Sequence, residues 1–100
     1  MQVHRIHPHR IRDTHYLSEL FDLLLYTLEN SPLQVTLRAL SYDTQIPENV
    51  LLRLRNLHRH PEDASDIRPE DYHLFFSHIL VRYPTVQLFV LPDGAPFVKL

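Results

Sequence analysis

The sequence predicts a mainly α protein, namely a small four-helix domain that ends in a β-hairpin. Three observations support this prediction. Leucine and aromatic side chains recur every three or four residues along most of the chain, which is the period of a helix buried on one side. Prolines stand where such segments begin or stop. A strand-like apolar run is found near the C-terminus.

The length of 100 residues corresponds to one domain. Residues 1–13 alternate His, Arg and Pro without a clear period, so we expect a basic N-terminal arm that is extended or loosely docked. Residues 14–100 are expected to form a single helical domain, with the hairpin in residues 85–100.

The first helix is predicted from Leu17 to Asn30, with Asp13 or Thr14 as its N-terminal cap. Its apolar side chains fall on one stripe, which should face the core. The members of this stripe are Leu17, Leu20, Phe21, Leu24, Leu25 and Leu28.

A second helix is predicted over residues 33–42, because Ser31 and Gln34 have the spacing of a capping box and Pro32 suits a first helical turn. Its inward side chains are expected to be Leu33, Leu37 and Leu40. Pro47 opens a third helix, which should run to about residue 57.

Pro69, followed by two acidic residues, begins a fourth helix, and Pro84 stops it. Residues 85–91 are strand-like. The sequence Pro92-Asp93-Gly94 then predicts a turn, because Gly94, the only glycine, readily adopts a positive φ. Residues 95–100 can return as the second strand of the hairpin.

The composition excludes several classes of protein. There is no cysteine, so disulfides and thiolate metal sites are absent. The eight histidines complete no recognisable ligand set, so neither a metal nor another cofactor is expected. A nucleophile motif and a glycine-rich phosphate loop are both missing, so we expect no enzymatic activity. Without a signal-peptide pattern or a bilayer-length apolar run, a cytoplasmic protein with no membrane partner is expected.

Residues 40–56 resemble the helix-turn-helix of small phage repressors and Cro-like regulators. The resemblance lies in Ser41 as the small residue after a Leu, in Thr44-Gln45-Ile46-Pro47 at the turn, and in Leu51 and Leu54 in the next helix. It implies a helix-turn-helix-like pair whose second helix enters the DNA major groove. Gln45 stands where the family has Gly, so we expect either a left-handed residue there or a changed turn.

At 100° per residue, the third helix turns Val50, Leu54 and Leu57 to one side. The other side carries Asn and Arg, which hydrogen-bond adenine and guanine edges, and a Leu that can meet a thymine methyl group. The arm would touch phosphate or the minor groove. The expected DNA contacts are Glu48, Asn49, Leu52, Arg53, Arg55, Asn56, Arg59, Arg5, Arg10 and Arg12.

The hairpin carries more apolar side chains than one helix layer can bury, so we expect it to join two copies as a homodimer. The expected interface residues are Phe89, Leu91, Phe97 and Leu100. These inferences together describe a small dimeric transcription regulator that binds DNA.

A second function fits the same sequence. The chain can be a non-enzymatic protein-binding module, like a small phage- or plasmid-type inhibitor or adaptor, that presents its helical bundle and hairpin to another protein. The net charge of −2, the acidic stretch in residues 61–75 and Gln45 favour this alternative.

Overall fold

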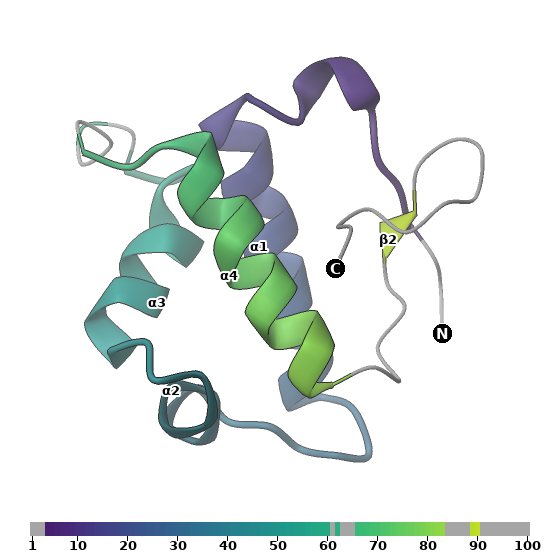
Figure 1. Cartoon of the computed structure of the whole chain (residues 1–100), viewed down its shortest axis with the longest axis vertical. Coiled ribbons are helices and arrows are strands. Elements are labelled where there is room, and N and C mark those ends of the chain that lie inside the picture. The colour runs from purple at the N-terminus through teal and green to yellow at the C-terminus, as the bar shows by residue number, and fades with distance from the viewer. Residues whose placement is uncertain (1–3, 61, 63–65, 84–88, 91–100) are drawn as a thin grey trace.

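The computed structural model describes residues 4–60, 62, 66–83 and 89–90. Four α-helices make up most of this part of the chain, which confirms the mainly helical fold (Figure 1). They are α1 (Thr14–Glu29), α2 (Leu37–Thr44), α3 (Glu48–Asn56) and α4 (Pro69–Arg82). A 3-10 turn, η1, spans Pro8–Arg10, and β1 (His4–Arg5) pairs in parallel with β2 (Phe89–Val90). Both α1 and α2 contact α3 and α4.

The first helix forms as predicted, with its start moved to Thr14. The side chain of Asp13 caps it by accepting from the backbone N–H groups of His15 at 3.0 Å and Tyr16 at 3.3 Å. The predicted stripe is buried along its full length, and Tyr16 and Ser18 are buried with it. This burial stabilises the helix more than its intrinsic propensity does.

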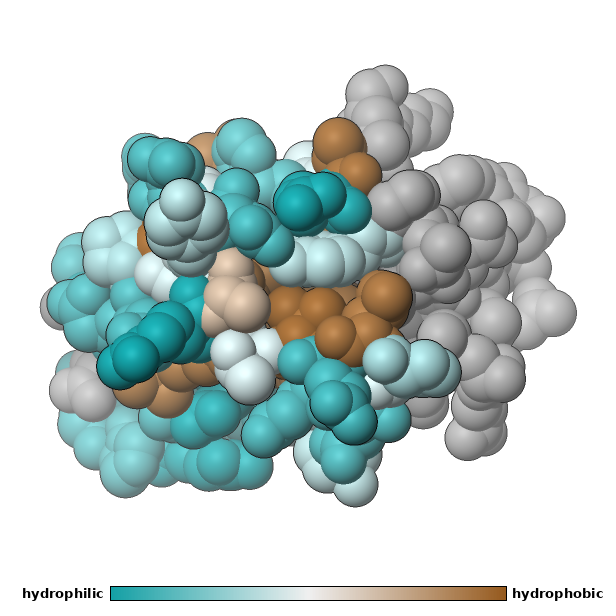
Figure 2. Space-filling view, turned by 90° about the horizontal axis from the view of Figure 1, so that it is seen from below, coloured by the Kyte–Doolittle hydropathy of each residue, from teal (hydrophilic) through white to brown (hydrophobic). Residues whose placement is uncertain are grey.

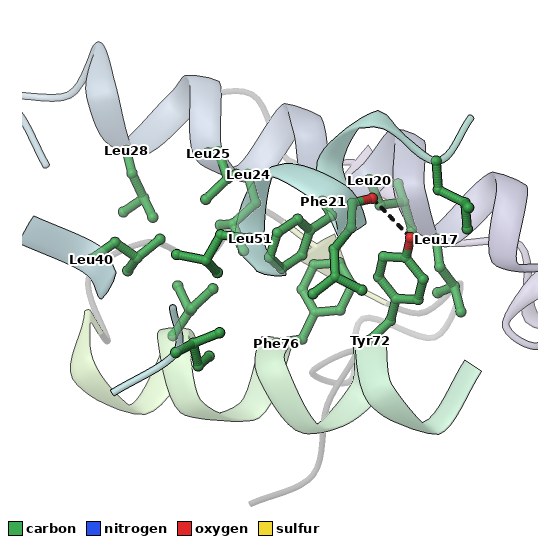
Figure 3. Packing of buried hydrophobic residues seen from close by; sticks show 14 of the residues in the cluster. Leu17, Leu20, Phe21, Leu24, Leu25, Leu28, Leu40, Leu51, Tyr72 and Phe76 are labelled. Atoms are coloured by element: carbon green, nitrogen blue, oxygen red, sulfur yellow. Dashed lines mark hydrogen bonds between the residues drawn. The ribbon is translucent and has the colours of Figure 1, made fainter. Parts of the chain in front are cut away.

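The core lies between α1 and α4 and is closed by α2 and α3 (Figure 3). The ring of Phe21 on α1 meets two rings of α4 edge-on. Its centroid is 5.9 Å from that of Tyr72 and 5.6 Å from that of Phe76. Edge-to-face contacts of this kind suit the charge distribution of aromatic rings. Leu24, Leu40 and Leu51 extend the core toward α2 and α3.

The predicted start of the second helix is wrong. Ser31 uses its hydroxyl to donate to the carbonyl of Leu28 at 2.8 Å, so it finishes α1 instead of capping a new helix. Gln34 has a φ of 49°, which breaks any helix there, and Leu33 is exposed, not inward. α2 begins at Leu37, four residues after the predicted start, where the hydroxyl of Thr36 accepts from the backbone N–H of Ala39 at 3.1 Å.

The segment before α1 is docked more firmly than its composition predicts. Ile6 is 1% exposed and belongs to the core, and Ile11 packs against it. The backbone N–H of His7 donates to the Tyr16 hydroxyl at 3.2 Å, and a ring nitrogen of His73 lies 2.9 Å from the Ile11 carbonyl oxygen. These apolar and polar contacts attach the segment to α1 and α4.

The predicted hairpin in residues 85–100 lies outside the described residues, apart from the two residues of β2. No helix of the described part of the chain is both long and apolar enough to cross a membrane.

Candidate nucleic-acid interface

The connection between α2 and α3 is a tight corner built around one left-handed residue. Gln45 has φ 64° and ψ 19°, the conformation that glycine adopts at lower cost. The next residue, Ile46, turns its side chain into the core and is buried. Ser41 donates from its hydroxyl to the Ile46 carbonyl at 2.5 Å, which fastens the corner to α2. The first of the two expected outcomes at Gln45 is therefore the observed one.

The inner face of α3 is set by three leucines. Leu51, Leu54 and Leu57 are buried against α1 and α2, and Val50 is partly buried. Their spacing of three residues follows the turn of the helix, so they hold one side of α3 to the core. The opposite side of α3 therefore faces away from the core.

The end of α3 is tied to two other helices through one carbonyl group. The oxygen of Leu54 accepts from the Tyr72 hydroxyl at 2.8 Å (dashed in Figure 3) and from the Ser18 hydroxyl at 2.8 Å. Ser18 also accepts from the backbone N–H of His58 at 3.0 Å. Because the last carbonyls of a helix lack partners within it, these bonds satisfy groups that burial would otherwise leave unpaired.

The outer face of α3 brings several of the predicted contact residues together. Glu48 and Asn49 are exposed, and Leu52 and Asn56 are half-buried. An open depression of about 300 Å³ runs along this face. Its lining comprises Asn49, Leu52, Arg53, Asn56, Leu57 and His60.

The arginines predicted to contact DNA are largely engaged in ion pairs within the chain. Arg59 lies 2.8 Å from Asp22, and Arg10 lies 3.4 Å from Asp13 and stacks over the Tyr16 ring. Two further pairs join distant segments, namely Arg53 with Asp66 and Arg12 with Glu70. The acidic partners lower the electrostatic potential of a face that the sequence alone presents as basic.

Arg55 lies toward α1 and α2, at the edge of the predicted contact surface. It is half-buried and lines a narrow crevice with Leu28 of α1 and Leu37 and Leu40 of α2. Its Nε donates to the side-chain oxygen of Asn56 at 3.3 Å. Arg55 is therefore only partly exposed and borders the ends of α1 and α2, whereas the sequence places it on the outer face of the helix. The side chain of Arg5 is outside the described part of the structure.

Sequence reasoning missed a polar cluster on α1. The Ser18 hydroxyl lies 2.9 Å from Nδ1 of His58, whose Nε2 lies 3.6 Å from Asp22. The order Ser, His, Asp is that of a hydrolase triad, yet Ser18 is 0% exposed and its hydroxyl is bonded to a main-chain carbonyl. No substrate carbon can reach it, so the cluster is structural. The sequence feature that could have indicated this cluster is Ser18 itself, a polar residue among the buried leucines of α1.

A second exposed surface lies between α2 and α4. Leu74 and Val81, two turns apart on α4, are 54% and 57% exposed. They border an open depression of about 390 Å³, whose polar lining includes Asp43 and Arg82.

The side of the molecule that faces down in Figure 1 is shown in Figure 2, where an apolar area is framed by hydrophilic side chains.

Within the described residues, no group of three or more His, Cys, Asp or Glu side chains could hold a metal ion. Comparison of the chain with known protein families, with curated proteins and with solved structures finds no match.

Proposed function

We propose that this chain is a DNA-binding regulator that inserts α3 into the major groove. The observation that carries the proposal is the corner at Gln45 and Ile46. A left-handed residue followed by a buried apolar residue sets α3 at a steep angle to α2, as the two helices appear in Figure 1. The outer face of α3 is then available to a duplex.

The chemistry of that face fits base edges. Asn49 and Asn56 each offer an amide that can bond the two edge atoms of adenine, and Arg53 can do the same with guanine. Leu52 supplies an apolar contact for a thymine methyl group. Arg59, beyond the helix end, and the arm residues Arg10 and Arg12 are suited to phosphates.

The proposal includes a cytoplasmic homodimer. Two copies related by a two-fold axis would present their α3 helices about 34 Å apart, one turn of duplex. The expected interface residues Phe89, Leu91, Phe97 and Leu100 belong to the hairpin segment, of which the structure describes only β2. Deletion of residues 85–100 should convert the dimer to a monomer in sedimentation.

The test is selection from a random duplex library, followed by anisotropy titrations at roughly 50–200 mM salt. Asn49→Ala should cost about 1–3 kcal/mol in binding and blur the preference at one base pair. Arg59→Ala should weaken all sequences alike and reduce the salt slope by about 0.9. Arg82→Ala on α4 removes the same charge away from α3 and should change neither. A wild-type chain that retards no duplex at about 50 mM salt would contradict the proposal.

A protein-binding module is the second candidate, and the exposed pair Leu74 and Val81 favours it. The ion pairs that neutralise Arg53 and Arg59 favour it too. In this case Leu74→Ser with Val81→Ser should abolish capture of the partner while leaving the melting temperature unchanged. The same double variant should bind DNA like the wild type if the first proposal is correct.

A further inference from the structure

Arg53 lies within the proposed DNA site but is already paired with an acidic side chain. Arg53 lines the depression on the outer face of α3, beside Asn49 and Asn56. It is thus the arginine that lines the same depression as the two amides proposed to read bases. Its guanidinium, however, faces a carboxylate of the same chain.

That carboxylate is Asp66, in the turn before α4. The pair is bidentate, with Nη1 of Arg53 3.2 Å from Oδ2 and Nη2 bonded to Oδ1. Hydrogen bonding to Arg53 is the main cause that holds the pKa of Asp66 below its usual value, so the carboxylate is charged at neutral pH.

A carboxylate and a phosphate present a guanidinium with the same pair of acceptor oxygens. Arginine therefore binds both in the same two-pronged geometry. Asp66 occupies the place at Arg53 that a phosphate or a guanine edge would need. The other acidic partner on this side, Asp22, is instead shared between Arg59 and His58 and faces the structural cluster.

The Asp66 pair is open to exchange. The side chains of Arg53 and Asp66 are 46% and 63% exposed, so water and ions reach both. Ion pairs in such surroundings contribute little to stability. An incoming polyanion can therefore replace Asp66 without disturbing the core.

We infer that Asp66 is an internal competitor for DNA, which holds Arg53 in the free protein and is displaced when a duplex binds. The inference rests on the proposed function and adds a form of autoinhibition to it. Any process that neutralises or moves Asp66 increases DNA affinity.

The experiment compares the full-length wild type with Asp66→Asn, Arg53→Ala and the double variant, in anisotropy titrations of a labelled mixed-sequence duplex. Asp66→Asn should tighten binding severalfold and steepen the salt slope by up to about 0.9, because the variant takes up no cation when the duplex binds. In the Arg53→Ala background the same change should have little effect. Glu19→Gln on α1 removes an equal charge from a carboxylate whose partner, His15, is not a proposed DNA contact, so it controls for net charge.

The outcomes separate the two proposals. If Asp66→Asn tightens binding equally with and without Arg53, or if Glu19→Gln tightens it as much, the effect is one of net charge and the inference is wrong. If the wild type binds and Asp66→Asn does not bind more tightly, the inference fails while DNA binding stands. If neither chain binds at about 50 mM salt, both proposals fail. Matching circular dichroism spectra confirm that each variant is folded.

Discussion

The hydroxyl of Ser18 lies 2.8 Å from the carbonyl oxygen of Leu54, and this bond joins the second turn of α1 to the end of α3. Ser18 is fully buried, so its bonds have no competition from water. Removing it would leave the His58 N–H without its acceptor and the Leu54 carbonyl with one donor fewer.

Ser18→Ala is therefore expected to lower the free energy of unfolding by about 1–3 kcal/mol, the cost of a buried polar group that loses its partner. Urea denaturation measures this loss. Ser77→Ala is the matched control, since its hydroxyl only donates back to the His73 carbonyl one turn earlier, and it should change stability by less than about 0.5 kcal/mol. Equal losses from the two variants would mean that Ser18 has no special role.

Alkaline solution should destabilise the fold through Tyr72. Burial raises the pKa of Tyr72 to about 12, above its usual 10.0. As pH rises above 10 the unfolded chain releases this proton first, so the free energy of unfolding falls until the pH passes the folded-state pKa of about 12. Tyr72→Phe should make that fall smaller, as denaturation at a series of pH values will reveal. Part of the fall in the free energy of unfolding should remain in Tyr72→Phe, because burial and Asp43 also raise the pKa of Tyr83 to about 12.

Gln45→Gly should stabilise the protein. The left-handed conformation costs a residue with a Cβ about 1 kcal/mol, and glycine avoids that cost. We expect a gain of roughly 0.5–1 kcal/mol in chemical denaturation, with DNA affinity unchanged. Tyr42→Gly, at an exposed position inside α2, should instead lose about 1 kcal/mol. A loss from both variants would contradict the conformation of the corner.

The corner and the inner face of α3 can be tested by core substitutions. Ile46→Asp places an unpaired carboxylate in the core and should unfold the domain. Leu51→Ala or Leu54→Ala should cost about 2–5 kcal/mol, as the truncation of a buried leucine does. Leu74→Ala on the exposed side of α4 is the control and should leave the melting curve near that of the wild type. A wild-type melt for Ile46→Asp would mean that water reaches the corner.

The sequence was sufficient for the elements whose structure is local. The leucine stripe of α1, the inner leucines of α3 and the Pro69 start of α4 follow from periodicity and capping, and the structure has all three. The start of α2 was not predictable in this way, because Ser31 matches both a helix cap and a bond back to the preceding turn. In the structure Val35 is buried and its backbone N–H donates to the Leu28 carbonyl at 3.0 Å, and a capping pattern in the sequence contains neither contact.

The candidate site was predictable in its residues but not in its electrostatics. Helical geometry places Asn49, Leu52 and Asn56 on one side. The pairing of Arg53 with Asp66, 13 residues away, and of Arg12 with Glu70, 58 residues away, arises only when the helices pack. No local pattern contains such contacts, so the sequence alone does not distinguish an unpaired arginine from one held by a distant carboxylate.

The docking of Ile6 and Ile11 has a consequence for synthesis on the ribosome. Ile11 meets His73 across 62 residues, which at about 5–20 residues per second corresponds to roughly 3–12 s of translation. During that interval the nascent chain has its first apolar residues and the stripe of α1 but no α4 to cover them. We expect such a chain to be a client of ribosome-bound chaperones until α4 emerges, and nascent chains stalled before residue 69 to remain sensitive to protease.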